Sequence, residues 1–287
     1  MLSSDRKALM SIKNKSLLRA LPLYGIFQLP QLLPAILPEY SALGANSIVI
    51  VISEYDRETS AHAIETVLRY CVLHGYRVYV SYENKYVDAS RNKLITEYTW
   101  MLNIAQRNGC EGIYIDCNNG HIDNFLIIKQ IAETCHSSGL RLFASMGISS
   151  NSDKSLLKVM NRLNLVDMLS ITHKYEIASS MPLPLDHAIR AIEIVRSHVN
   201  EDQHLVMAIP ANIVRSHATF LLEIVNSWRA VGIADFFVWG GFCANQAYFL
   251  NDHTLIDHGF GYSQIGKIFG RQYLYTKFAA EFNSLTR

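Results

Sequence analysis

The sequence predicts an α/β protein, a single (β/α)8 TIM barrel that spans residues 1–287 as one domain. Short runs rich in β-branched residues alternate with longer amphipathic runs along the whole chain, and this alternation is typical of a parallel sheet. Eight such units lie between residues 21 and 284, a length that is usual for this barrel. A doubly wound open sheet is the rival fold, but no G-x-G-x-x-G fingerprint follows the first predicted strand, "LPLYGIFQ".

The strands are the better-marked elements. "NSIVIVIS", for example, is a buried strand by its β-branched content. The eight strands are predicted at 21–28, 46–53, 76–83, 111–118, 140–147, 166–174, 203–211 and 234–242.

Helices are predicted between the strands from their apolar spacing and their stop signals. Glycines close several of them, and prolines stand where two of them begin. These helices are predicted at 29–44, 58–75, 89–109, 124–139, 153–164, 184–199, 217–232 and 262–284.

Composition narrows the class of protein. Hydrophobic residues make up 49% and charged residues 18%, enough apolar material for a large core. The net charge is +1, so we expect no nucleic-acid partner and no membrane surface as a partner. Arg19 and four prolines interrupt the apolar run near the N-terminus, which predicts neither a signal peptide nor a membrane span. The five cysteines form no C-x-x-C pair, which favours a reducing, cytoplasmic location.

The chemistry of this barrel type lies at the carboxyl ends of its strands, so polar residues there are the candidates. In "EGIYIDCNN" side chains alternate between the two faces of the strand. Ile113 and Ile115 are then expected to face the helices, and Tyr114, Asp116 and Asn118 the interior. Asp116 could instead accept backbone hydrogen bonds at the start of a loop. A carboxylate in a barrel strand nevertheless favours a ligand role, because buried charge needs a partner.

This stretch resembles the fourth-strand signature D-x-x-D-x-D-x-E of the family 18 glycoside hydrolases, the chitinases and their relatives. "GIYID" and the later "HLVMAIPA" are similar to the family's strands, and Trp239 resembles its pocket-floor tryptophan. The resemblance implies that Asp116 orients a sugar substituent. The position of the family's general acid is Asn118, which carries no titrating proton, and its middle Asp is Tyr114.

The predicted function is therefore that of a carbohydrate-active, glycoside hydrolase-like barrel with an altered or lost catalytic acid. Asp116 is the central catalytic candidate, and Glu83 or Glu176 would have to supply any acid. Aromatic side chains near strand ends suit both sugar stacking and ordinary barrel packing. Substrate contacts are predicted from Tyr55, Tyr82, Tyr114, Asn118, Asn119, His173, Tyr175, Asn212 and Trp239.

Two other functions are left open by the sequence. Lys174 follows "LSIT" and would share an inward face with Ser170 and Thr172, as the Schiff-base lysine of a lyase or aldolase would. A non-catalytic sugar-binding or scaffold barrel is the other. Asp116, His121, His173 and Glu176 could meet at the mouth, but no H-x-H or H-E-x-x-H spacing supports a metal, so we predict no metal and no cofactor. The expected partner is a small-molecule or oligosaccharide ligand, and a homo-oligomer remains an option.

Overall fold

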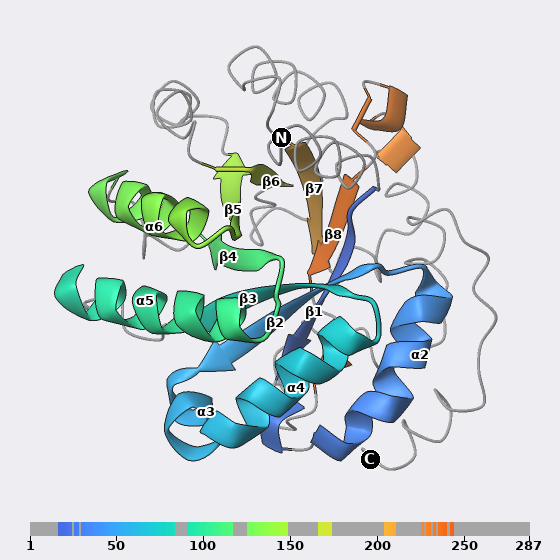
Figure 1. Cartoon of the computed structure of the whole chain (residues 1–287). Coiled ribbons are helices and arrows are strands. Elements are labelled where there is room, and N and C mark those ends of the chain that lie inside the picture. Colours follow the sequence, from blue (N-terminus) through green and yellow to red (C-terminus); the bar gives the residue numbers. More distant parts are fainter. Residues whose placement is uncertain are drawn as a thin grey trace, which may run out of the picture.

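Eight parallel strands close into a barrel, which confirms the predicted (β/α)8 fold (Figure 1). Each strand pairs with the next along the chain, and β8 returns to β1 through the pairs Arg19–Phe236 and Ala20–Phe237. The strands are β1 (Arg19–Tyr24), β2 (Ser47–Ser53), β3 (Arg77–Glu83), β4 (Gly112–Asp116), β5 (Arg141–Ile148), β6 (Met168–His173), β7 (His204–Pro210) and β8 (Asp235–Trp239). A two-residue strand, β9 (Phe242–Cys243), pairs with β1.

The computed structural model describes a large part of the chain, with gaps that fall mainly in its second half. The described residues are 17–24, 26–28, 30–83, 91–116, 125–148, 166–173, 204–210, 225–226, 228–230, 232–233, 235–239 and 242–243.

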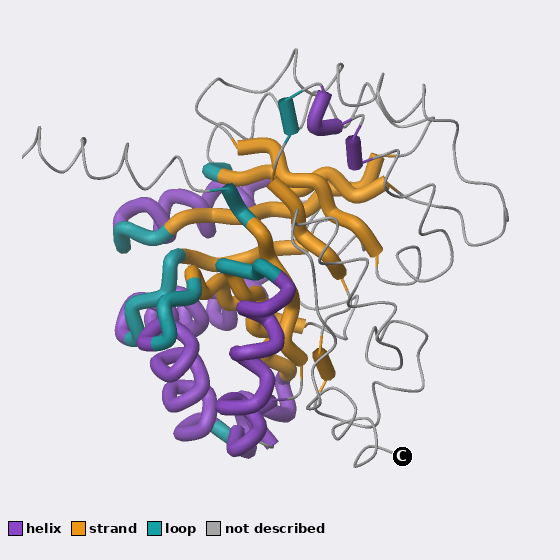
Figure 2. The backbone as a smooth tube through the Cα atoms, turned by 90° about the vertical axis from the view of Figure 1, so that its right-hand side faces the viewer, coloured by secondary structure: helices purple, strands orange, loops and turns teal. Residues whose placement is uncertain are grey.

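Helices lie outside the strands (Figures 1 and 2). Within the described residues they are η1 (Ile26–Gln28), η2 (Pro30–Leu32), α2 (Leu33–Leu43), α3 (Glu54–Thr59), α4 (Ala61–Leu73), α5 (Arg91–Arg107) and α6 (Phe125–Ser137). None of these helices is long and apolar enough to cross a membrane. The predicted helices at 153–164, 184–199 and 262–284 lie outside the described residues, and of 217–232 the described residues 225–226 and 228–230 are helical.

Two elements differ most from the sequence prediction, the first strand and the helix that follows β2. β1 begins at Arg19 and ends at Tyr24, because its pairing with β8 starts at Arg19 and the chain then bends into η1. The helix predicted at 58–75 is two helices, α3 and α4. α3 begins earlier because Ser53 and Asp56 form a capping box: Asp56 N donates to Ser53 Oγ (3.2 Å) and Ser53 N donates to Asp56 Oδ2 (3.0 Å).

Strand alternation divides the apolar residues into two cores. The outer core lies between the strands and the helices, and it contains Ile113 and Ile115 as predicted. The inner core fills the barrel, so the interior is packed rather than open. Its buried members are Leu18, Ala20, Val49, Val51, Tyr79, Tyr114, Phe143, Met168, Val206, Ala208 and Phe237.

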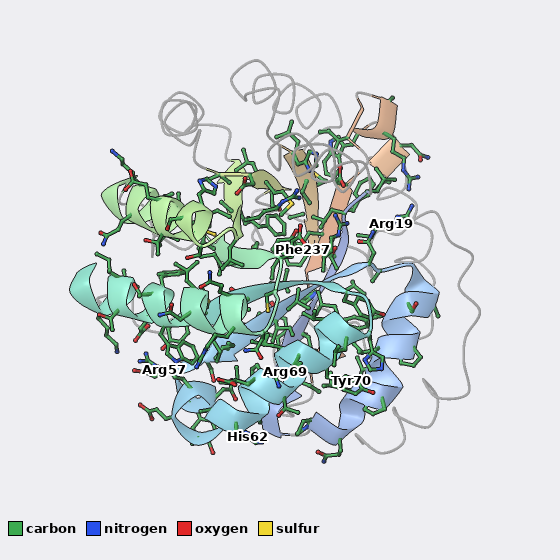
Figure 3. All side chains as sticks on the ribbon, viewed as in Figure 1. Arg19, Arg57, His62, Arg69, Tyr70 and Phe237 are labelled. Carbon is green, nitrogen blue, oxygen red and sulfur yellow. The ribbon has the colours of Figure 1, made fainter. Side chains whose placement is uncertain are left out.

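Four aromatic rings form the centre of the inner core, and we call them the aromatic floor: Tyr79, Tyr114, Phe143 and Phe237. Figure 3 shows Phe237 inside the ring of strands, whereas Arg57, His62, Arg69 and Tyr70 lie among the helices. Phe143 meets the other three edge to face, with ring centroids 5.0 Å from Tyr114, 5.6 Å from Tyr79 and 5.7 Å from Phe237. Such edge-to-face pairs add to the stabilisation that burial gives.

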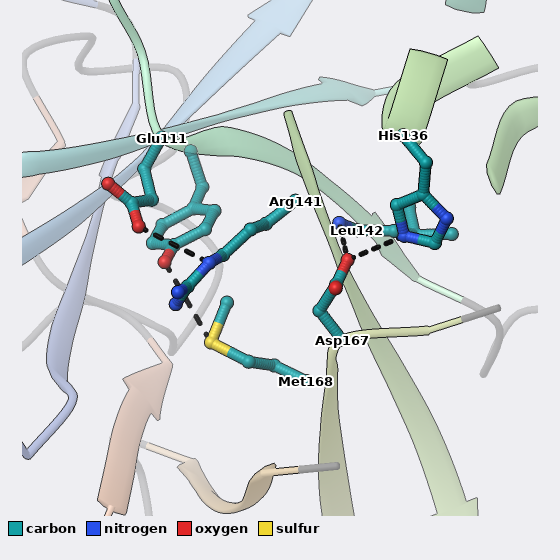
Figure 4. Close-up of polar contacts among 7 residues, drawn as sticks. Glu111, His136, Arg141, Leu142, Asp167 and Met168 are labelled. Carbon is teal, nitrogen blue, oxygen red and sulfur yellow. Dashed lines mark hydrogen bonds and ion pairs between the residues drawn. The ribbon is translucent and has the colours of Figure 1, made fainter. Parts of the chain in front are cut away.

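Polar residues close the N-terminal end of the barrel below this floor (Figure 4). Arg141 Nε lies 3.5 Å from Glu111 Oε1, and Asp167 Oδ2 accepts from the backbone N–H of Leu142 at 2.8 Å. His136 Nε2 lies 2.9 Å from the same carboxylate oxygen. These contacts join β5 and α6 to the residues that immediately precede β4 and β6. In this barrel type the N-terminal end contributes to stability, and chemistry takes place at the opposite end.

The half-buried carboxylate of Asp235 belongs to the same end of the barrel. Asp235 accepts a hydrogen bond from the backbone N–H of Leu18 and so fastens β8 to the residue before β1. Burial raises the pKa of Asp235 above its ordinary value, although the Leu18 N–H and the nearby His204, Arg77 and Arg19 act in the opposite direction.

Candidate functional site

Asp116 stands at the last position of β4, where the sequence predicted a ligand-facing carboxylate. Tyr114 lies in the inner core and Ile115 in the outer core, so alternation gives Asp116 an inward position. Its side chain is half-buried. The predicted inward orientation is therefore confirmed for Tyr114, and Asp116, two residues later, lies on the same face of β4.

Two serines continue from Asp116 across the neighbouring strands. Asp116 pairs in register with Ser145 of β5, and Ser145 pairs with Ser170 of β6. Both serines have an exposed fraction of 0%. Because Phe143 and Met168, two residues before each serine, belong to the inner core, the serines also take inward positions. We call Asp116, Ser145 and Ser170 the polar row; it lies on the C-terminal side of the aromatic floor.

Tyr114 forms part of that floor. Its ring is 1% exposed, and its centroid lies 5.3 Å from that of Phe237. Of the two roles that the sequence left open for aromatic side chains, barrel packing is thus confirmed for Tyr114. A contact between Tyr114 and a substrate stays a prediction.

Tyr82 lies on the other side of the sheet from Tyr114. It packs in the outer core with 8% of its surface exposed. Side chains alternate along β3, and since Tyr79 points into the barrel, Tyr82, three residues later, points to the helices. Burial raises the pKa of Tyr82, and the Glu97 carboxylate raises it further by its charge and by accepting a hydrogen bond. The structure therefore does not bring Tyr82 and Tyr114 together in one site.

Tyr55 is 60% exposed on α3, directly after the carboxyl end of β2. α3 is tied to α5 by two ion pairs, Lys93–Glu54 at 3.0 Å and Arg57–Glu97 at 3.6 Å. The Arg57 guanidinium also stands 5.0 Å from the centroid of the Trp100 ring. These contacts hold an exposed aromatic side chain at the carboxyl-end side of β2.

The remaining predicted site residues are described less fully. Glu83, His173 and Trp239 end their strands, where Glu83 pairs with Ser53, His173 with Ile148 and Trp239 with Pro210. The other six predicted positions lie outside the described residues: Asn118, Asn119, Lys174, Tyr175, Glu176 and Asn212. Their predicted roles stay predictions.

Three cysteines of the described residues are poor candidates for a nucleophile. Cys71, Cys110 and Cys135 are buried and form no disulfide. Burial raises the pKa of each thiol to about 12, so all three are protonated at neutral pH. Among the residues that the structure describes, no three His, Cys, Asp or Glu side chains gather as metal ligands would.

Comparison with known proteins supports the fold and does not select a reaction. No family model and no curated protein matches the chain. In structure it is similar to a GH18 chitinase from Pseudoalteromonas aurantia (10% identity, TM-score 0.54, 77% of this chain and 93% of that one). It is also similar to the tryptophan synthase alpha chain from Legionella pneumophila (12% identity, TM-score 0.55, 93% and 96%).

An N-acetylneuraminic acid synthetase from Leptospira borgpetersenii is a third such structure (12% identity, TM-score 0.51, 94% of this chain and 90% of that one). The three similar proteins carry out different chemistry on one barrel. At these identities the likeness shows the fold alone, so function has to be argued from the site.

From the sequence, Ser145 is expected at a strand end and Ser170 on an inward face, but neither serine is assigned a catalytic or substrate-binding role. The signal was present, since "LFAS" and "MLSI" each place a serine two positions after a large inward residue. What the sequence lacked was the register between strands, which sets both serines in line with Asp116.

Proposed function

We propose that the chain binds a carbohydrate at the C-terminal face of the barrel, as a glycoside hydrolase-like protein with an altered or lost catalytic acid. The observation that carries this proposal is the polar row, which places Asp116, Ser145 and Ser170 in register next to a floor of aromatic rings. A carboxylate accepts hydrogen bonds from sugar hydroxyls, and serine hydroxyls both donate and accept.

A sugar has apolar ring faces and a polar rim, and its ring faces stack on exposed aromatic rings. The rings of the aromatic floor are buried against one another, so they support the polar row from below. The exposed ring of Tyr55 on α3 would add a stacking surface near the mouth. The predicted acid position holds Asn118, so ordinary general-acid hydrolysis is not expected from this strand. If the protein hydrolyses a glycoside, Glu83 or Glu176 supplies the acid.

The test replaces Asp116 by alanine and measures sugar binding. We expect Asp116→Ala to lose detectable binding in isothermal titration against monosaccharides and oligosaccharides, while its thermal unfolding stays cooperative. Losing a charged hydrogen-bond acceptor costs about 1.5–3 kcal/mol, roughly 10- to 150-fold in affinity. Glu133→Gln is the control, because it removes an exposed carboxylate on α6, which lies outside the barrel strands. Unchanged affinity in Asp116→Ala contradicts the proposal.

A lyase that uses Lys174 is the second candidate. Lys174 comes directly after β6. The hypothesis depends on strand alternation: Met168 and Ser170 take inward positions, and Lys174 would take the same face if the alternation continued. Borohydride reduction in the presence of small aldehydes and ketones separates the two functions. Labelling at Lys174 supports the lyase, and an unlabelled chain across the carbonyl panel counts against it.

A further inference from the structure

The hydroxyl of Ser170 is an unused hydrogen-bonding group inside the barrel. The residue has an exposed fraction of 0%, and within the described part of the chain no hydrogen-bond partner reaches Ser170 Oγ. A buried hydroxyl without a partner is costly, since it has given up its hydrogen bonds to water. Native proteins rarely retain such a group unless it serves a purpose.

Another buried serine of the barrel shows what a satisfied hydroxyl looks like. Ser47, on β2 near the N-terminal end, is equally buried, but its Oγ lies 2.9 Å from Asn46 Oδ1, to which it donates. The two hydroxyls differ in hydrogen bonding, and they lie at opposite ends of the barrel. Ser47 belongs to the closed polar end of the barrel, whereas Ser170 belongs to the polar row with Asp116.

Geometry limits the size of ligand that could reach both ends of the polar row. Adjacent strands are about 4.8 Å apart, so Asp116 and Ser170 are separated by roughly 10 Å along the sheet. The curvature of the barrel brings the inward side chains closer than that. A single six-membered ring with hydroxyl groups on opposite sides fits this separation.

We propose that Ser170 is a ligand contact, and that the site takes a polyhydroxylated single ring whose hydroxyls bind Asp116 and Ser170 together. The inference rests on the proposed carbohydrate function and adds to it a specific residue and a ligand size. A longer oligosaccharide would enter through its terminal ring.

This proposal gives Ser170→Ala an unusual pair of effects. Removing a hydroxyl that has no partner relieves the free protein of an uncompensated group, so its melting temperature should rise by about 1–3 °C. Removing a ligand contact should weaken sugar binding roughly 3- to 10-fold. Ser47→Ala is the matched control, because it deletes a satisfied hydroxyl: its melting temperature should fall and its sugar affinity should not change.

The experiment measures melting temperature and affinity for wild type, Ser170→Ala and Ser47→Ala. The probes are D-glucose, D-galactose, D-mannose and their monodeoxy analogues. We expect one deoxy analogue of the tightest sugar to bind wild type and Ser170→Ala equally, because the hydroxyl that meets Ser170 is then missing from the ligand.

The outcomes distinguish this inference from the function on which it rests. A Ser170→Ala variant that melts lower and binds the sugars as wild type does overturns the inference, since the hydroxyl then serves the folded chain through an internal water. Sugar binding by wild type and loss of binding in Asp116→Ala would still support the proposed function. If Ser170→Ala melts higher but wild type binds no sugar, the carbohydrate class is wrong for both.

Discussion

Replacing Gly112 by alanine is expected to destabilise the barrel by about 3 kcal/mol or more. Gly112 opens β4 and pairs in register with Arg141 of β5. A β-carbon at this position would collide with the carbonyl oxygen of Arg141 and stand 2.8 Å from its carbonyl carbon. The obstacle is backbone held in the ladder between β4 and β5, so it cannot swing away as a side chain could. Urea unfolding followed by circular dichroism measures the loss.

A second glycine separates this collision from the general cost of losing a glycine. Gly139 follows α6 with φ of +71° and has nothing within 4 Å of an added β-carbon. Gly139→Ala therefore pays only for a left-handed backbone, roughly 1–2 kcal/mol. Equal losses in the two variants would show that β4 and β5 do not approach each other at Gly112 as described.

Replacing Phe143 by alanine should remove about 3–5 kcal/mol of unfolding free energy. Phe143 has an exposed fraction of 0% and contacts all three other rings of the aromatic floor. The four rings come from four strands, so the surrounding barrel cannot collapse into the cavity without moving its hydrogen-bonded ladder. The unfolding midpoint should shift while the slope against denaturant stays constant.

Leu73→Ala is the control for that measurement. Leu73 ends α4 with 76% of its surface exposed, so truncating it should change stability by less than about 0.5 kcal/mol. A Phe143→Ala variant with a loss as small as that of Leu73→Ala would contradict a packed barrel interior. Since Ser145 lies two residues from Phe143, we also expect the cavity to weaken ligand binding at the polar row.

The fold was predictable because its signals are local. Each strand is a short apolar run with β-branched residues, and each of the predicted strand ranges overlaps a strand of the barrel. The first strand was placed too late, because its start depends on the distant pairing of Arg19 with Phe236. α3 was missed although Ser53-x-x-Asp56 carries a capping signature, since the helix has too few residues to show an apolar period.

The candidate site was predictable in part. Alternation along one strand gave Tyr114 and Asp116 their inward positions, because it needs no knowledge of other strands. Tyr82 was grouped with the same site because it stands near a strand end, without regard to which face of the strand it occupies. The structure places it in the outer core. The polar row was not predictable, because registers such as Asp116–Ser145 are set by the closure of the whole barrel.

The measurement that tests the central claim most directly is the mapping of backbone amide shifts during titration with the tightest-binding sugar. We predict that the amides of Asp116, Ser145 and Ser170 shift, and that those of Ser47, Glu111 and Arg141 at the opposite end of the barrel do not. Shifts confined to the N-terminal end, or to the helix layer around Glu97, would contradict a ligand site on the polar row.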